Sequence, residues 1–302
     1  MSKTPFIENL SAVADRYDAL LCDAWGVIHD GRNVFPDVAE ALRRFRHDRG
    51  PVIILTNAPK PAHIIGPQLD GLGLARDCYD AIVTSGEATR AEIENRRGMS
   101  AFRIGWDSDL ILYEGLDVRF AELDKAEFIV CTGLSDVFGF DPVAYRSLLA
   151  KAAVAGKEMI CANPDLVVRW KGDLIYCAGA VAREYEALGG PVIYAGKPYP
   201  AVYDLSFRLI ERAICEPDGP VGDPVGDEGS DSGGPAVSAK RVLAIGDGAG
   251  TDILGANRYG VDAIYVTGDG GVHQGGDDAG AIDAALAEAG ATAMAAMRRL
   301  KW

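Results

Sequence analysis

The sequence contains no apolar run that could cross a membrane, because none approaches the roughly 20 apolar residues that a spanning helix needs. Its first residues, MSKTPFIENL, also lack the apolar segment of a secretory signal. These absences predict a cytoplasmic protein and exclude a membrane as its partner.

Positive charge is also scarce. The chain carries 30 Lys and Arg residues against 44 Asp and Glu residues, which leaves a formal charge of -14 at pH 7. A duplex-binding protein needs a basic face that displaces counterions, so nucleic acid is excluded as a partner. An anionic substrate would need a local pocket that carries a cationic side chain or a metal ion.

Cysteine and histidine form no metal-binding pattern. The six cysteines are spread along the chain without C-x-x-C spacing, and the four histidines form no metal-type pair with them. At this chain length the spread predicts reduced, mostly buried thiols rather than a disulfide framework. The cysteines are Cys22, Cys78, Cys131, Cys161, Cys177 and Cys215, and the histidines are His29, His47, His63 and His273.

Apolar residues are abundant and arranged in short runs. A length of 302 residues favours two domains, and a hydrophobic content of 48% suffices for a sizeable core. Short runs rich in Val, Ile and Leu alternate with helical periodicity, which predicts an α/β fold with a Rossmann-like, doubly wound parallel sheet. We expect strands at 18–23, 51–55, 80–84, 191–195, 241–245 and 262–266, and helices at 38–48, 86–97, 200–214, 252–259 and 282–301. In the last helix, Met294 and Met297 are expected to form a packing stripe.

A different rhythm after residue 100 predicts a second unit inserted into the first. Strands are expected at 101–105, 128–131 and 158–161, around a helix at 142–155. We therefore divide the chain into a core of residues 1–85 and 182–302 and a smaller α/β unit of residues 86–181. Residues 216–240 are rich in Gly, Pro, Asp and Ser, which predicts a flexible loop within the core. An acidic docking loop is the alternative.

The residues that follow the predicted strands could form a reaction site, because ligands of open α/β sheets bind beyond the carboxyl ends of the strands. A carboxylate follows the first strand, a hydroxyl and an amide follow the second, a lysine follows the strand at 191–195, and two carboxylates follow the strand at 241–245. Two carboxylates on a loop that leads into a helix suit Mg²⁺. These residues are Asp23, Thr56, Asn57, Lys197, Asp247 and Asp252. Taken singly, each is more often a helix cap, a turn residue or a surface side chain.

The order of these residues resembles the haloacid-dehalogenase superfamily, and within it the NagD-like class IIA proteins with a C2-type cap. The resemblance covers nearly the whole chain and implies that residues 86–181 are a C2-type cap domain. Its motifs are Asp23 with Gly26-Val27, Thr56-Asn57, Gly196-Lys197-Pro198, and Gly246-Asp247 with Thr251-Asp252; Asn163-Pro164-Asp165 resembles the end of the cap.

The resemblance implies a reaction. Asp23 would attack phosphorus and form an aspartyl-phosphate, which splits one difficult displacement into two easier ones. Thr56, Asn57 and Lys197 would hold the transferring oxygens. The implied function is a phosphohydrolase that acts on a small phosphorylated metabolite.

The resemblance also implies a metal and a substrate contact. Mg²⁺ would be held by Asp23, Asp247 and the backbone carbonyl of Trp25, with Asp252 in support. A bound cation would also draw an anionic substrate into an acidic protein. Asn163 and Asp165 would face the substrate from the cap.

One position departs from the superfamily pattern. Phosphatases of the superfamily usually carry a second Asp two residues after the nucleophile, which protonates the leaving oxygen and activates water, and here that position is Trp25. Three interpretations stay open: a slow phosphatase, another reaction such as that of a dehalogenase or phosphonatase, and a phosphate-binding protein without catalysis. Trp25→Asp is expected to raise phosphatase activity, provided that the indole is not needed for packing. Asp30 is a conceivable replacement acid, although an Asp-Gly pair more often makes a turn, and His29 is expected to be structural or solvated.

Other interpretations rest on single features. The run Gly246-x-Gly248-x-Gly250 could indicate a dinucleotide-binding module, but its spacing is not G-x-G-x-x-G. The Arg-Trp-Lys run at 169–171 could face the substrate or form an exposed edge strand, and residues 268–276, with His273, could border the pocket or form a plain loop. Sugar phosphates, pyridoxal phosphate, phosphoglycolate and nucleotide monophosphates are all compatible substrates. A homodimer is compatible with a C2-type cap, although no residue predicts one.

Overall fold

The computed structural model describes residues 3–216, 237–268, 270–273 and 275–302. Most of the loop predicted at 216–240 therefore lies outside the described residues. Within the described ranges, no helix is both long and apolar enough to cross a membrane.

The larger sheet, here called the core sheet, contains six strands that all run parallel. Their order is β13-β12-β11-β1-β2-β3. The bounds are β1 Ala19–Cys22, β2 Val52–Thr56, β3 Ala81–Thr84, β11 Val242–Gly246, β12 Asp262–Val266 and β13 Ala295–Met297. Five of these strands lie where the sequence predicts them, and β13 does not.

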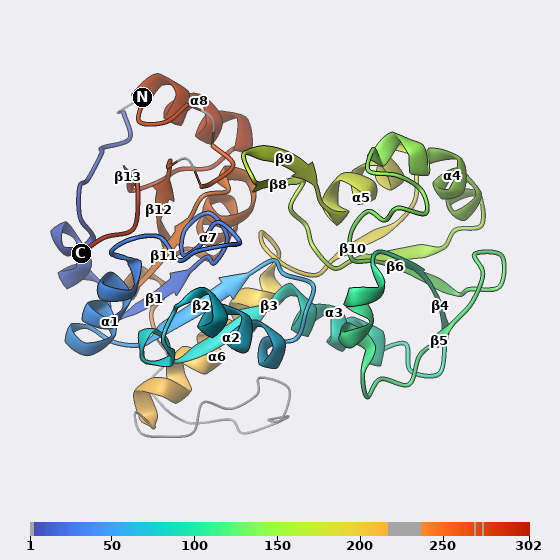
Figure 1. Cartoon of the computed structure of the whole chain (residues 1–302), viewed down its shortest axis with the longest axis horizontal. Coiled ribbons are helices and arrows are strands. Elements are labelled where there is room, and N and C mark those ends of the chain that lie inside the picture. Colours follow the sequence, from blue (N-terminus) through green and yellow to red (C-terminus); the bar gives the residue numbers. More distant parts are fainter. Residues whose placement is uncertain (1–2, 217–236, 269, 274) are drawn as a thin grey trace.

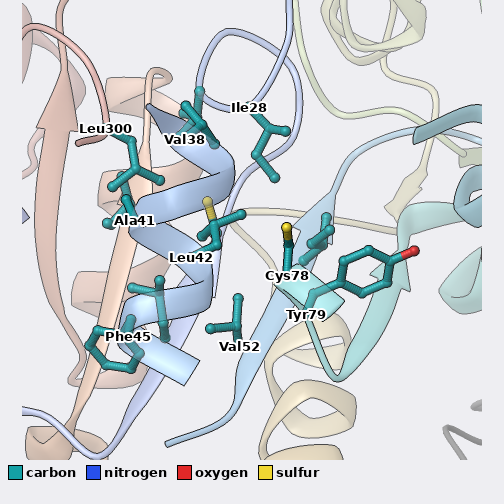
Figure 2. Close-up of a cluster of buried hydrophobic side chains, with 14 of the residues drawn as sticks. Ile28, Val38, Ala41, Leu42, Phe45, Val52, Cys78, Tyr79 and Leu300 are labelled. Carbon is teal, nitrogen blue, oxygen red and sulfur yellow. The ribbon is translucent and has the colours of Figure 1, made fainter. Parts of the chain in front are cut away.

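Both faces of the core sheet are covered by helices. Successive side chains of a strand point to opposite faces, so Leu20 and Cys22 join one buried cluster while Ala19 and Leu21 join the other. The first face is covered by α1 (Val38–Asp48) and α2 (Ala62–Leu72), and Figure 2 shows the apolar side chains of α1 directed into this cluster. The second face is covered by α6 (Pro200–Cys215), α7 (Leu254–Tyr259) and α8 (Ala279–Ala289). The prediction of a Rossmann-like, doubly wound α/β fold is confirmed.

A second, five-stranded parallel sheet, here called the insert sheet, lies beside the core (Figure 1). Its order is β10-β7-β6-β4-β5, with bounds β4 Ser100–Ile104, β5 Arg119–Phe120, β6 Phe128–Cys131, β7 Glu158–Cys161 and β10 Val192–Tyr194. Its helices are α3 (Ser85–Glu94), α4 (Arg146–Val154) and α5 (Ala178–Ala187). An antiparallel hairpin of β8 (Val167–Trp170) and β9 (Asp173–Tyr176) lies between the two sheets (Figure 1).

The strand predicted at 191–195 belongs to the insert sheet, which corrects its assignment to the core. Its observed counterpart, β10, pairs with β7 through Val192 and Tyr194. The boundary predicted at residue 181 also falls inside α5, whose buried residues Val181 and Tyr185 pack in the cluster under the insert sheet. By its hydrogen bonds and its packing, the inserted unit therefore extends beyond residue 181 and includes β10.

The helix predicted at 282–301 is wrong in its second half. The helix α8 ends at Ala289, and Gly290 follows in the left-handed conformation with φ of 65°, which terminates a helix. The chain then returns as β13 along β12, where Met297 pairs with Val266 and is fully buried. Pairing at the sheet edge overrides the helical preference of this Ala-rich segment. Met294 and Met297 still pack against the first core cluster, as expected, but from the segment of β13 rather than from a helix.

Phe45 of α1 is a test of the first core cluster, since its ring is fully buried there (Figure 2). We expect Phe45→Ala to lower the free energy of unfolding by about 3–5 kcal/mol, because a large buried ring is lost and leaves a cavity. Glu40→Ala on the same helix removes only an exposed ion pair with Arg44 and should change it by about 0.5 kcal/mol or less. Urea unfolding measures both, and equal effects of the two variants would contradict this account of the core.

Candidate active site

Side chains from both units meet at the carboxyl ends of the core strands. Asp23 follows β1, Thr56 ends β2, and Asp247 follows β11. A wide helical turn, Ala249–Ile253, comes next and carries Asp252. Together with residues of the insert, they line a cavity of about 580 Å³.

Three carboxylates form the floor of this cavity. Oxygen atoms of Asp23, Asp247 and Asp252 all lie within 4.8 Å of one another, and the three residues are 6–7% exposed. Their approach depends on Gly26, because a Cβ there would stand 2.4 Å from Asp247 Oδ2. Gly26 also has φ of +83°, a conformation that side-chain-bearing residues rarely adopt. Position 26 therefore requires glycine, because a side chain there would collide with Asp247 after β11.

Lys197 supplies the positive charge at the centre of the cluster. Its buried ammonium donates to Asp23 Oδ1 at 2.5 Å, to Asp252 Oδ1 at 2.6 Å and to the carbonyl of Leu55 at 2.8 Å. All three of its protons are thus in use. Burial by itself lowers the pKa of Lys197, but the attraction of Asp23 and Asp252 outweighs it and holds that pKa well above the usual value. The lysine is therefore charged and fixed in place.

The oxygen atoms of the cluster fit a divalent cation. Asp252 is fully engaged, since Lys197 donates to Oδ1 and the N–H of Gly248 donates to Oδ2 at 2.9 Å. Asp23 Oδ2 and Asp247 Oδ1, by contrast, accept no hydrogen bond from the described part of the chain, while Val272 N–H donates to Asp247 Oδ2 at 2.7 Å. Hard cations prefer such oxygens. This donor set suits Asp23 and Asp247 as ligands, with Asp252 in support.

The raised pKa of Asp247 also favours a bound cation in the cluster. Its pKa is raised well above the usual range, first by burial and then by the charges of Asp23 and Asp252. The pKa of Asp23 is also raised by burial, although Lys197 acts against that rise. One ammonium is too little positive charge for three buried carboxylates. A second cation would remove the imbalance.

Asn57 bonds to both the insert and the lysine. Its amide donates to Asp165 Oδ1 at 2.9 Å and to the carbonyl of Lys197 at 3.2 Å, and its oxygen accepts from the N–H of Lys197 at 2.8 Å. Both amide protons are thus engaged within the protein. Thr56 is buried, lines the cavity and has a hydroxyl that accepts from Ala58 N–H, which leaves its proton available as a donor.

Asn163 and Asp165 reach the cavity from the end of β7. The side chain of Asn163 accepts from the N–H of Asp165 at 3.0 Å, which shapes the turn. Through its bond to Asn57, Asp165 connects the insert directly to the strand end of β2. Both residues line the cavity as expected for side chains that face a substrate.

Trp25 is engaged by the β8–β9 hairpin. Its indole N–H donates to the carbonyl of Arg169 at 3.0 Å, and its ring lies 5.6 Å from that of Trp170. A Cβ on Gly31 would come within 2.4 Å of both rings, so the two indoles fill the space above that glycine. The prediction that Trp25→Asp raises phosphatase activity assumed that the indole is not needed for packing, and this assumption is not met. The indole is needed for packing, and replacing it would release the hairpin along with adding a carboxyl group.

Residues 169–171 contact the core rather than a substrate. Arg169 Nε donates to the carbonyl of Gly271 at 2.8 Å, and Lys171 lies over the ring of Trp170 in the turn of the hairpin. None of these residues lines the cavity. They form a hairpin that docks on the core, which differs from both interpretations of the sequence.

The residues just after Trp25 are structural. Asp30 accepts from the backbone N–H groups of Arg32 and Asn33 in a turn and does not line the cavity, so it is no replacement acid. His29 is buried, accepts from Gly31 N–H and meets the ring of Trp25 edge-on. Burial lowers the pKa of His29 to about 4, which keeps the imidazole neutral.

The loop after β12 does border the cavity. Val272 lines it and donates to Asp247, whereas His273 is buried against the hydroxyl of Tyr265. Residues 269 and 274 of this loop lie outside the described residues. The Gly246-x-Gly248-x-Gly250 run serves the carboxylate cluster, since Gly248 N–H binds Asp252.

The cavity residues missed in the sequence include Arg183 on α5, Tyr199 after Lys197, and Arg258 on α7. Helical periodicity placed Arg258 on a helix but carried no sign of the direction that its side chain takes. The position of Tyr199 directly after the Gly196-Lys197-Pro198 motif was the one usable signal.

Known proteins share this architecture. Residues 20–119 match the family described as haloacid dehalogenase-like hydrolase, and residues 194–292 match a second family model described as HAD-hydrolase-like. A hydrolase of the haloacid dehalogenase-like family from Brucella suis is 37% identical, with 98% of this chain and 100% of that chain covered and a TM-score of 0.81.

More distant relatives are named phosphatases. A D-glycerol 3-phosphate phosphatase of Mycobacterium tuberculosis is 24% identical over 85% of this chain, and the match spans 65% of that protein's length. The ribonucleotide monophosphatase NagD of Escherichia coli is 22% identical over 82% of this chain and 86% of its own. A structure of the mycobacterial glycerol phosphate phosphatase in complex with magnesium has 23% identity and a TM-score of 0.60, covering 86% of this chain and 70% of that one.

The hydrogen bond of Trp25 can be tested without an activity assay. In Trp25→Phe, which keeps a ring but loses the N–H, backbone amides of β8 and β9 should exchange with solvent roughly fivefold faster, because a lost hydrogen bond costs about 1 kcal/mol. Trp106→Phe is the control, since Trp106 is exposed and stacks on Phe140 away from the hairpin. Unchanged exchange in Trp25→Phe would show that the hairpin is held without the indole.

Proposed function

The chain belongs to the haloacid dehalogenase-like hydrolase family, and on this premise we propose that it is a Mg²⁺-dependent phosphohydrolase of small phosphomonoesters. One observation carries the proposal: the Lys197 ammonium bridges Asp23 and Asp252 beside Asp247 in a cavity. The names of the relatives, which include a glycerol phosphate phosphatase and a ribonucleotide monophosphatase, support a phosphate ester as substrate.

Asp23 is the proposed nucleophile. A carboxylate offers about four lone-pair sites, and Lys197 uses one of them. An oxygen of Asp23 attacks phosphorus as the ester P–O bond breaks, which yields an aspartyl-phosphate and an alkoxide that takes its proton from solvent water; a second water then attacks phosphorus, loses a proton to solvent, releases phosphate and restores the carboxylate. Lys197 keeps the nucleophile oriented and offsets its charge.

The remaining residues orient the phosphoryl group and the cation. The Thr56 hydroxyl is the proposed donor to a phosphoryl oxygen, and Asn57 fixes the backbone of Lys197. Asp23, Asp247 and the carbonyl of Trp25 would hold Mg²⁺. When bound, the cation would neutralise charge on the transferring group.

Trp25 favours slow turnover, because its side chain can neither protonate the leaving oxygen nor accept a proton from the attacking water. General acid–base help contributes typically about 10²–10⁴-fold. Substrates with good leaving groups, such as p-nitrophenyl phosphate, depend least on that help. The second candidate, a phosphate-binding protein without catalysis, is favoured by the same residue, whose indole is committed to the hairpin.

The two candidates differ in what Asp23→Asn does. We expect the wild-type chain to hydrolyse p-nitrophenyl phosphate with Mg²⁺, and Asp23→Asn to lose activity by roughly 10³-fold or more, because the attacking oxygen is gone. Asp30→Asn is the matched control, since Asp30 is a half-buried turn residue that does not line the cavity. Phosphate binding by the wild-type chain with no hydrolysis and no trapped aspartyl-phosphate would establish the binding protein instead.

The metal can be tested through stability as well as activity. Chelation should abolish turnover and lower the melting temperature, since three buried carboxylates then share one ammonium, and Mg²⁺ should restore both. Asp247→Asn should weaken the affinity for Mg²⁺, measured from the melting temperature, by at least about tenfold, because loss of even an outer partner of a metal ligand costs that much. Asp136→Asn, which removes an exposed carboxylate of the insert, should not. Full activity in chelator would contradict the proposal.

A further inference from the structure

The cavity is larger than a phosphoryl group needs. Its volume of about 580 Å³ lies within the range of about 300–1,000 Å³ that pockets for whole small molecules occupy. Its inner end holds the carboxylates and Lys197, so the remaining space is available to the leaving group of a substrate. The residues that line this outer space include Arg183, Tyr194, Tyr199, Glu186 and Arg258.

Two arginines line the cavity from different units. Arg183 lies on α5, which packs under the insert sheet, while Arg258 lies on α7, which packs on the core sheet (Figure 1). Both charges act on the phenol of Tyr199 and lower its pKa, against the larger raising effects of burial and of Glu186. The two guanidinium groups therefore share one neighbourhood around Tyr199.

Within the described part of the chain, neither arginine has a polar partner. Arg183 and Arg258 are exposed and make no hydrogen bond or ion pair with any residue that the structure describes. A carboxylate that lines this end, Glu186, accepts a hydrogen bond from the hydroxyl of Tyr194 at 2.7 Å. Positive charge thus exceeds negative charge at the outer end, the reverse of the inner end.

The outer end also has a rigid apolar wall. The rings of Tyr194 and Tyr199 stack with centroids 4.9 Å apart and planes 3° from parallel. Tyr199 stands two residues after Lys197, so a ligand that meets Lys197 with one end passes this wall on its way to the arginines. An extended small molecule fits between the two charged ends.

We propose that Arg183 and Arg258 bind a second anionic group, a carboxylate or a phosphate, on the leaving portion of the substrate. The inference rests on the proposed function and narrows its substrates to phosphomonoesters that carry a further acid. Guanidinium groups hold such anions through paired N–H donors in a fixed fork. A substrate of this class would touch the core through Arg258 and the insert through Arg183, whereas an ester with a neutral tail would leave both unused.

Matched phosphonates test the inference independently of turnover. A series of ω-carboxyalkyl phosphonates and n-alkyl phosphonates of equal length, together with α,ω-bisphosphonates, is titrated into the wild-type chain with Mg²⁺ by calorimetry. We expect the compounds with a second acid to bind roughly tenfold more tightly at the best length, as two solvent-screened charge pairs would give. The carboxylate and bisphosphonate arms separate the two kinds of acid.

The preference for a second acid should fall in Arg183→Gln and in Arg258→Gln and vanish in the double variant. Arg208→Gln removes an exposed arginine of α6 that does not line the cavity, and the preference should survive it. Equal binding of acidic and neutral tails by the wild-type chain, or a preference that persists in the double variant, would overturn the inference. Hydrolysis of p-nitrophenyl phosphate is recorded separately, because it reports on the proposed function and not on the tail.

Discussion

The contact between the Lys197 ammonium and two buried carboxylates holds the candidate site together. One nitrogen joins Asp23 after β1, the carbonyl of Leu55 in β2 and Asp252 in the turn after β11. Breaking a buried ion pair by removing one partner typically costs about 3–5 kcal/mol, since the other charge stays buried and uncompensated. Because Lys197 follows β10 of the insert sheet, the charge balance of the core depends on a residue that the insert delivers.

Much of this site could be predicted because parallel strands end at one edge. Asp23, Asp247 and Asp252 each come soon after a short apolar run, so the sequence alone brought them together. Lys197 does lie beside these carboxylates. The strand before it was assigned to the core sheet, however, and it pairs with β7 of the insert sheet instead. An apolar run indicates that a strand exists, but each sheet here has an apolar cluster on both of its faces, so the run cannot indicate which sheet it joins.

The side-chain contacts could not be predicted, because their partners are far apart in the sequence. Asn57 and Asp165 are 108 residues apart, and Trp25 and Arg169 are 144 residues apart. No local pattern records such pairs. The end of the chain failed for a related reason: an Ala-rich segment favours a helix in isolation, while the exposed edge of β12 offers it backbone partners as β13. Tertiary pairing decided both cases.

The aromatic contact at position 25 gives the protein an internal optical reporter. Two of the four tryptophans, Trp25 and Trp170, lie with ring centroids 5.6 Å apart, one from the core and one from the hairpin. Indole emission depends on the polarity and proximity of its surroundings. Any change that parts the hairpin from the core would therefore alter the native fluorescence, so that the contact between them can be followed in the unlabelled chain.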